Sequence, residues 1–120
     1  LGGGGSTTAY TVEIAKKGIR NILRHAGIIQ GELEVGKTLD LEMPDEQCYI
    51  FSETSGLVEH CVDLGEEVKV GQLVAKVHNV ERTGLDPVEY FAVINGIYTG
   101  RHFPGLIANG DFLGVVAVPV

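Results

Sequence analysis

The sequence has no tryptophan, one methionine, four prolines and only two cysteines among its 120 residues. Cys48 and Cys61 form no CxxC pair and have no cluster of histidines near them, so reduced thiols are favoured over a disulfide between them. No apolar run approaches the roughly 20 residues that cross a membrane. No signal-peptide pattern is present either, and we therefore predict a cytoplasmic protein without a membrane partner.

Basic side chains are also scarce. Nine Lys and Arg stand against 16 Asp and Glu, which gives a formal net charge of −7. A nucleic-acid binder needs a basic face to replace the counterions at phosphates, so this class is excluded. Glycine, by contrast, is abundant at 17 residues, and 44% of the chain is hydrophobic. This composition predicts a domain with a core and many tight turns between short strands.

Residues 7–26 are predicted to form one amphipathic helix, with charged side chains opposite an apolar face. Ser6, Thr7 and Thr8 are candidate N-caps, and Gly27 is suited to end the helix. Gly18 lies on the apolar face, where a glycine often marks close packing. A single helix of this kind needs a partner surface. The apolar face consists of Ile14, Ala15, Gly18, Ile19, Ile22, Leu23 and Ala26.

The periodicity changes after residues 28–37, a connector rich in glycine and glutamate. Leu39, Leu41 and Met43 alternate with polar residues, which is the two-residue period of a strand. From there to residue 120, short apolar segments are separated by turn signals such as Asn95-Gly96. The pattern predicts a mainly β domain over residues 38–120, preceded by the helix.

The β region repeats itself. Gly56 and Gly71 in its first half match Gly96 and Gly110 in the second, 40 and 39 positions later. Each half contains a small residue with glycine, a strand, an apolar anchor, a second strand, a glycine turn and a third strand. Two matched halves of this kind indicate an internal duplication with pseudo-twofold symmetry.

The duplicated pattern resembles the barrel-sandwich hybrid of biotinyl/lipoyl-type carrier domains over residues 52–118. Its most recognisable phrase is Gly65 to Leu73. A carrier domain displays a lysine on the hairpin that joins its halves. Here residues 78–90 form that joint and contain no lysine, while Lys76 lies before it in an apolar strand. A covalently bound biotin or lipoyl group is therefore not expected.

No catalytic or metal-binding constellation is visible. The four histidines form no HxxE, HxH or HExxH pattern, and zinc needs convergent ligands at recognisable spacing. No G-x-S-x-G elbow, dinucleotide fingerprint or P-loop is present. We therefore predict no catalytic residue and no metal ligand within this chain. The histidines are His25, His60, His78 and His102.

One polar cluster stands out, in residues 101–105. Arg101 supplies a fixed charge, His102 a titratable ring, and Phe103-Pro104-Gly105 a constrained turn. Two interpretations remain open: a solvated turn, or a loop presented to a neighbouring active site or subunit.

Three phrases together resemble the C-terminal part of the succinylglutamate desuccinylase/aspartoacylase family, and its branch of N-acetyl-diaminobutyrate deacetylases most closely. They are residues 1–5, residues 18–28 within the helix, and the tract from residue 80 through the 101–105 cluster to Gly110-Asp111. The resemblance spans nearly the whole chain. It implies a zinc carboxypeptidase-like α/β catalytic domain followed by a β-rich domain.

The family resemblance also implies where the chemistry lies. Zinc is held by an HxxE pair and a later His, and the general base is a Glu in a Glu-x-Gly-Gly context. Leu1-Gly2-Gly3 matches the end of that context, so the base is expected just before Leu1 and the zinc ligands farther upstream. Residues 1–27 are then the tail of the catalytic domain, 28–37 a connector, and 38–120 the β domain. The isolated chain is expected to hold no zinc, whereas the full-length protein does.

The implied reaction is zinc-dependent hydrolysis of the amide in a small N-acyl amino acid, whose carboxylate suits an arginine partner. Arg82, Arg101 and His102 are the candidates for the mouth of the active site. The expected partners are the chain's own catalytic domain, this substrate and, in a homo-oligomer, further copies of the protein. The alternative is a non-enzymatic barrel-sandwich adaptor. Such adaptors commonly carry coiled-coil heptads in the joint, where this chain has Gly84 and Pro87.

Overall fold

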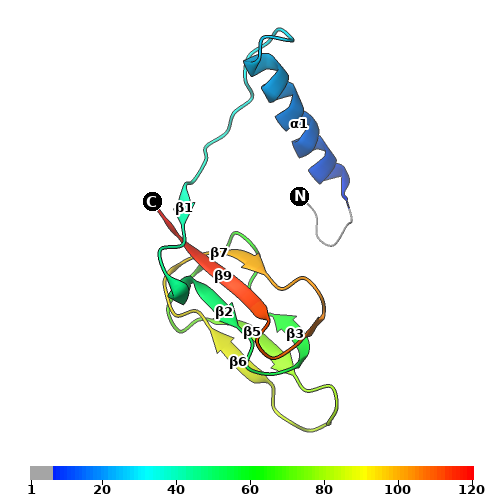
Figure 1. Cartoon of the computed structure of the whole chain (residues 1–120), viewed down its shortest axis with the longest axis vertical. Coiled ribbons are helices and arrows are strands. Elements are labelled where there is room, and N and C mark those ends of the chain that lie inside the picture. The colour runs from blue at the N-terminus through cyan, green and yellow to red at the C-terminus, as the bar shows by residue number, and fades with distance from the viewer. Residues whose placement is uncertain (1–6) are drawn as a thin grey trace. The chain divides into compact units, whose positions relative to one another are not determined.

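The computed structural model describes residues 7–120, so the predicted glycine-run match in residues 1–5 and the N-cap candidate Ser6 lie outside the described residues. The chain divides into two compact units, Leu1–Thr38 and Leu39–Val120. Figure 1 shows the helix of the first unit and the strands of the second. No helix in the described part of the chain is long and apolar enough to span a membrane.

Helix α1 (Ala9–His25) has a well-formed beginning and end. The Thr8 side chain accepts the main-chain N–H of Thr11 at 3.2 Å, and the Thr11 hydroxyl oxygen accepts that of Thr8 at 2.9 Å. This reciprocal cap satisfies donors that the first turn leaves free. After Ala26, Gly27 has a φ of 71°, a conformation that glycine adopts without strain. The predicted helix is confirmed, with each end moved inward by one or two residues.

Part of the predicted connector lies against this helix. The Asn21 side chain donates to the main-chain oxygen of Glu34 and accepts its N–H, both at 3.0 Å. Arg24 Nη1 pairs with Glu34 Oε1 at 2.8 Å, and this hydrogen bond lowers the pKa of the Glu34 carboxyl. Polar contacts therefore hold residues near Glu34 to one side of the helix.

Within its own unit, the apolar face of α1 is left open by the described residues. None of its side chains is buried, and Ile19 and Ile22 are 58% and 67% exposed. A Cβ at Gly18 would meet nothing within 4 Å. The close packing predicted at Gly18 is therefore not provided within the unit that contains α1.

The second unit consists of short strands and one 3₁₀ turn, η1 (Glu46–Cys48). The strand predicted from the alternation at residues 39–43 covers only Leu41 and Glu42, because β9 offers them just Pro119 and Val118 as partners. The strands are β1 (Leu41–Glu42), β2 (Tyr49–Phe51), β3 (Gly56–His60), β4 (Glu67–Val68), β5 (Leu73–His78), β6 (Val88–Phe91), β7 (Gly96–Arg101), β8 (Leu106–Ile107) and β9 (Phe112–Pro119).

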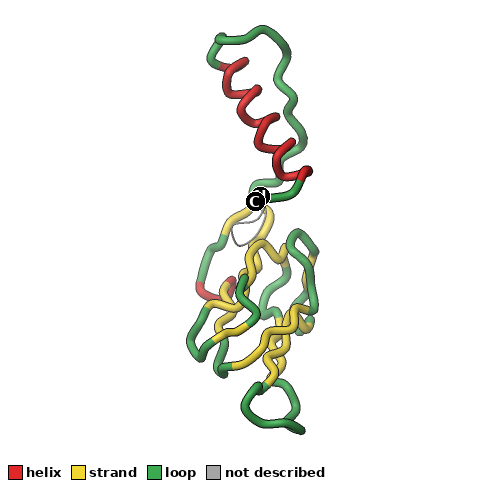
Figure 2. Tube along the Cα trace, turned by 90° about the vertical axis from the view of Figure 1, so that its right-hand side faces the viewer, coloured by secondary structure: helices red, strands yellow, loops and turns green. Residues whose placement is uncertain are grey.

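These strands form two antiparallel sheets, drawn in yellow in Figure 2. One has the order β1-β9-β7-β4, with β2 also paired to β9, and the other has the order β6-β5-β3-β8. The run β2 to β5 thus corresponds strand for strand to the run β6 to β9. Each half contributes two strands to each sheet. In one sheet β2 and β4 pair with β9 and β7, and in the other β6 and β8 pair with β5 and β3. The strand order reproduces the duplication predicted from the sequence.

The core lies between the two sheets and follows the same duplication. Val77 of β5 and Val116 of β9 are each 1% exposed, and Val68 of β4 and Ile107 of β8 are 2% and 4% exposed. Burial of such side chains contributes roughly 1.5–3 kcal/mol each to folding. The prediction of a mainly β domain preceded by a helix is confirmed.

Candidate functional site

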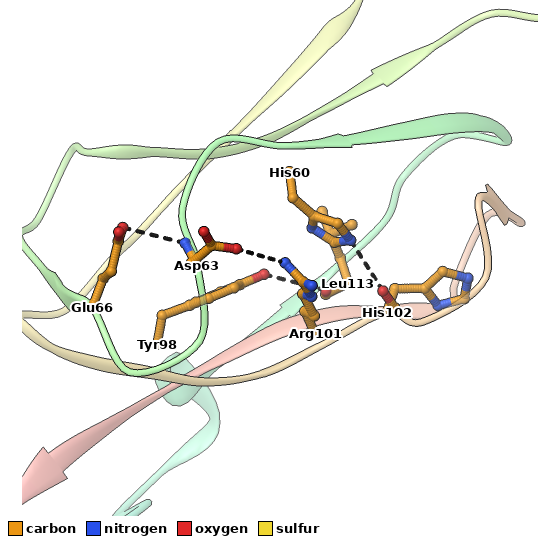
Figure 3. A network of polar contacts seen from close by, with 7 residues as sticks. All are labelled: His60, Asp63, Glu66, Tyr98, Arg101, His102 and Leu113. Carbon is orange, nitrogen blue, oxygen red and sulfur yellow. Dashed lines mark hydrogen bonds and ion pairs between the residues drawn. The ribbon is translucent and has the colours of Figure 1, made fainter. Parts of the chain in front are cut away.

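The residues of the predicted 101–105 cluster lie where β7 ends. Arg101, its last residue, pairs through Nη1 with Asp63 Oδ1 at 3.1 Å (Figure 3). Asp63 begins the turn after β3, and Glu66 Oε2 accepts its main-chain N–H at 3.2 Å. The Arg101 guanidinium therefore has an anionic partner from its own chain. Because the Asp63 side chain is 82% exposed, the pair contributes at most about 1 kcal/mol.

His102 is bonded to the main chain on every side. Its Nδ1 lies 3.0 Å from the Phe112 oxygen and its Nε2 lies 2.9 Å from the Leu106 oxygen. Its main-chain N–H donates to the Leu113 oxygen at 2.8 Å. Carbonyl oxygens only accept, so a neutral ring donates to one of the two and a protonated ring to both. The imidazole thus fastens the loop before β8 to the start of β9.

His60 of β3 lies beside these residues. Its Nε2 donates to the His102 oxygen at 3.0 Å, which leaves Nδ1 buried without a partner in the described chain. Burial lowers the pKa of His60 below 6.5, and the bond to His102 opposes this in part. The sequence did not group His60 with His102, because the two lie 42 positions apart and share no motif. Only the arrangement of the sheets brings them together.

Tyr98 completes the cluster in Figure 3 from the core side. Its ring is fully buried, and its hydroxyl points to the Leu113 oxygen at 3.5 Å. Burial raises the pKa of Tyr98 to about 12. Because its side chain is fully buried, Tyr98 is part of the core.

Arg82 lies elsewhere, in the loop of residues 79–87 that projects beyond β5 and β6 (Figures 1 and 2). Asn79 Oδ1 accepts the main-chain N–H groups of Glu81 and Arg82 at 2.9 and 2.8 Å, which shapes the first turn of this loop. The Arg82 side chain is exposed and forms no ion pair with residues 7–120. The three predicted site residues therefore occupy two places, Arg101 with His102 and Arg82 alone.

Residues 7–120 contain no group of three or more His, Cys, Asp or Glu side chains that could hold a metal ion. The nearest approach is a pair, His78 Nε2 with Glu59 Oε2 at 2.6 Å. Catalytic zinc sites have three protein ligands and an open position. The residues present in this part of the chain therefore do not fit the zinc that the family resemblance implies. Both cysteines are free, Cys48 buried and Cys61 exposed.

No family model matches the chain. Among solved structures, a succinylglutamate desuccinylase from Silicibacter sp. TM1040 superimposes with a TM-score of 0.88 at 52% identity, covering 100% of this chain and 36% of that one. A succinylglutamate desuccinylase/aspartoacylase from Rhodobacter sphaeroides gives a TM-score of 0.87 at 30% identity, covering 97% and 37%. Nearly the whole chain is thus similar to a segment of proteins of the succinylglutamate desuccinylase/aspartoacylase family. This segment makes up about a third of the length of each of them. The predicted resemblance is confirmed.

Two relatives point to one branch of this family. The chain is 43% identical over 119 residues to N-alpha-acetyl-L-2,4-diaminobutyric acid deacetylase of Halomonas elongata, which covers 98% of this chain and 35% of the relative. It also matches the product-bound ectoine utilization protein EutE (DoeB) of Ruegeria pomeroyi, with a TM-score of 0.90 at 52% identity, covering 98% and 36%. The chain therefore spans about a third of the length of these relatives. The adaptor alternative is not favoured.

Proposed function

We propose that this chain is the non-catalytic part of a zinc-dependent amidohydrolase that removes the acyl group from a small N-acyl amino acid. The observation that carries the proposal is the 43% identity with a deacetylase over 98% of the chain. The name of the Halomonas elongata relative points to N-acetyl-diaminobutyrate as the substrate of the full-length protein. A cytoplasmic location and assembly into homo-oligomers remain predictions.

The division of the chain follows from this assignment. Residues 1–27 belong to the α/β catalytic domain, residues 28–37 form a connector, and residues 38–120 form a barrel-sandwich hybrid. The exposed apolar face of α1 supports the first point, because a stripe of this size needs a covering surface. The contribution of two strands from each half to each sheet supports the last point.

The catalytic groups come from the rest of the polypeptide. The family resemblance implies that zinc and the general base lie outside the described residues, which offer no three-ligand metal site. Of the candidates for the mouth of the active site, Arg82 has the guanidinium best able to donate hydrogen bonds to a substrate carboxylate, because Arg101 is paired with Asp63. The ring of His102 is occupied by two main-chain oxygens, which supports a role in shaping the loop.

The test compares the 120-residue chain with a longer polypeptide that contains it. Zinc content and amine release are measured with N-acetyl-diaminobutyrate, N-acetylaspartate and N-succinylglutamate. We expect zinc and turnover only in the longer polypeptide, with N-acetyl-diaminobutyrate preferred. Stoichiometric zinc and turnover in the 120-residue chain would contradict the proposal. So would a longer polypeptide that releases no amine from any N-acyl amino acid.

A further inference from the structure

The strands β2 and β6, labelled in Figure 1, are edge strands, one from each sheet. An apolar groove runs between them. It has a volume of ≈ 370 Å³, and we call it the β2–β6 groove. Its apolar lining is partly open to solvent, with exposed fractions between 39% and 53%. These lining residues are Tyr49, Phe51, Val88, Phe91 and Val93.

The side chains that face outward from these strands have the wrong polarity for solvent. In β2, Ile50 points into the core while Phe51 is 53% exposed. In β6, Tyr90 is buried while Phe91 is 44% exposed. A strand with one wet face normally alternates apolar residues inside with polar residues outside. An uncovered apolar edge strand also invites association, so folded proteins cover or charge such edges.

Hydrogen bonds within the chain already hold the floor of the groove in place. The Tyr90 hydroxyl lies 3.2 Å from Ser52 Oγ and accepts the main-chain N–H of Glu53 at 2.9 Å. These bonds tie β6 to the segment that follows β2. On the rim, the Phe51 ring meets the Phe112 ring edge to face, with centroids 6.3 Å apart. The groove is therefore a preformed surface, which lowers the entropic cost of docking.

Charge argues against a second copy as the occupant. The unit Leu39–Val120 contains 13 Asp and Glu against 4 Lys and Arg. At the groove itself, Glu89 is paired with Lys76, whereas Glu53 has no cationic partner among the described ion pairs. A twofold contact through this groove would bring acidic surfaces together, since each copy presents the same patch.

The rest of the full-length polypeptide is the better occupant. Relatives that match 98% of this chain are about three times as long. A full-length protein of that length would carry a covalently attached segment that makes up about two thirds of it. Attachment raises its effective concentration at the groove. Resting on the proposed function, we propose that the β2–β6 groove docks this remaining part of the enzyme, through an apolar segment with a basic residue opposite Glu53.

Hydrogen exchange tests the docking directly. Peptides covering residues 49–53 and 88–93 are compared between the 120-residue chain and the longer polypeptide, with residues 64–71 as the reference. We expect exchange at both groove peptides to slow by at least about tenfold in the longer polypeptide, and at the reference to stay the same. Equal exchange at the groove peptides in both proteins would overturn the proposal.

Matched variants test the side chains. In the longer polypeptide, F51E and F91E should abolish the added protection, whereas V70E, at a residue 61% exposed and outside the groove, should not. Circular dichroism of the 120-residue chain checks that each variant still folds. Sedimentation of that chain as a dimer that F51E dissociates would make a second copy the occupant and overturn the proposal.

The two proposals fail separately. A longer polypeptide that hydrolyses N-acetyl-diaminobutyrate, but leaves the groove peptides unprotected, would remove the docking surface and leave the function. A longer polypeptide that protects the groove peptides, but releases amine from no N-acyl amino acid, would overturn the proposed function and leave the proposed docking surface standing.

Discussion

Gly56 and Gly96 occupy equivalent positions in the two sheets, each pressed against the main chain of the strand beside it. A Cβ on Gly56 would overlap the main-chain oxygen of His78 and the side chain of Val77. A Cβ on Gly96 would overlap the main-chain oxygen of Ala117 and the side chain of Val116. Neither contact can relax without moving a strand, because the main-chain atoms belong to β5 and β9. The duplicated glycines seen in the sequence are thus required by close approach of two backbones.

This relationship predicts that G56A and G96A each lower the free energy of unfolding by about 3 kcal/mol, the scale of overpacking in a tight site. The control is G105A, since a Cβ there would meet only Leu57 Cδ1 at an ordinary 3.5 Å. Urea denaturation of the 120-residue chain measures all three. A loss below about 0.5 kcal/mol in both test variants would show that the strands can separate at these points.

Replacing Gly18 by alanine should stabilise the 120-residue chain but destabilise the longer polypeptide. In the 120-residue chain G18A should raise helix stability by about 1 kcal/mol, because nothing lies within 4 Å of the new Cβ and alanine is the better helix former. In the longer polypeptide, where the apolar face is expected to pack closely, the same change should destabilise. Thermal unfolding followed by circular dichroism reports both. Stabilisation in both proteins would mean that no surface packs closely at Gly18.

His60 predicts part of the pH dependence of stability. Its pKa is lowered in the folded state by burial, so below pH 6.5 the unfolded chain binds a proton that the folded chain resists. Stability is therefore intact above pH 6.5 and falls as the pH drops below that value. H60Q, which keeps a donor but does not titrate, should lose less stability between pH 7.5 and 5.5 than the parent. Equal losses in urea titrations would exclude His60 as the cause.

The hydrogen bonds of the Tyr90 hydroxyl under the β2–β6 groove should contribute measurably to the free energy of unfolding. Y90F removes the hydroxyl that meets Ser52 and Glu53, which leaves the partly buried N–H of Glu53 without its acceptor and should cost about 1–2 kcal/mol. Y49F serves as the control, because that hydroxyl reaches only the Met43 sulfur at 3.6 Å in an exposed position. Equilibrium denaturation compares them, and the two variants should differ by at least about 1 kcal/mol.

Arg82 and His102 should respond differently in the longer polypeptide. R82Q should raise KM for the N-acyl amino acid more than it lowers kcat, since an exposed guanidinium that holds a carboxylate contributes mainly to binding. H102A should lower thermal stability, because its ring joins the Leu106 and Phe112 oxygens. Steady-state kinetics and melting curves separate the effects. Unchanged KM in R82Q would remove Arg82 from the substrate site.

Local sequence was enough to predict several elements. The apolar spacing of residues 14–26 and the cap candidates Ser6, Thr7 and Thr8 predicted α1, and Thr8 is the cap. The matched glycines predicted the duplication, because a turn or a close approach requires glycine whatever lies around it. Motifs quoted from the sequence also predicted the family, and the relatives confirmed it at 43–52% identity over nearly the whole chain.

The tertiary structure decided which polar groups meet and which surfaces stay open. Asp63 and Arg101, or His60 and His102, are separated by about 40 positions and share no motif, so only the crossing of strands between sheets brings them together. The same crossing leaves Phe51 and Phe91 on neighbouring edges with no covering strand in the described chain. The sequence alone determined the periods, caps and turns, because these depend on neighbours along the chain. The pairing of distant residues depends on how the two sheets close over one core, and only the folded chain specifies that.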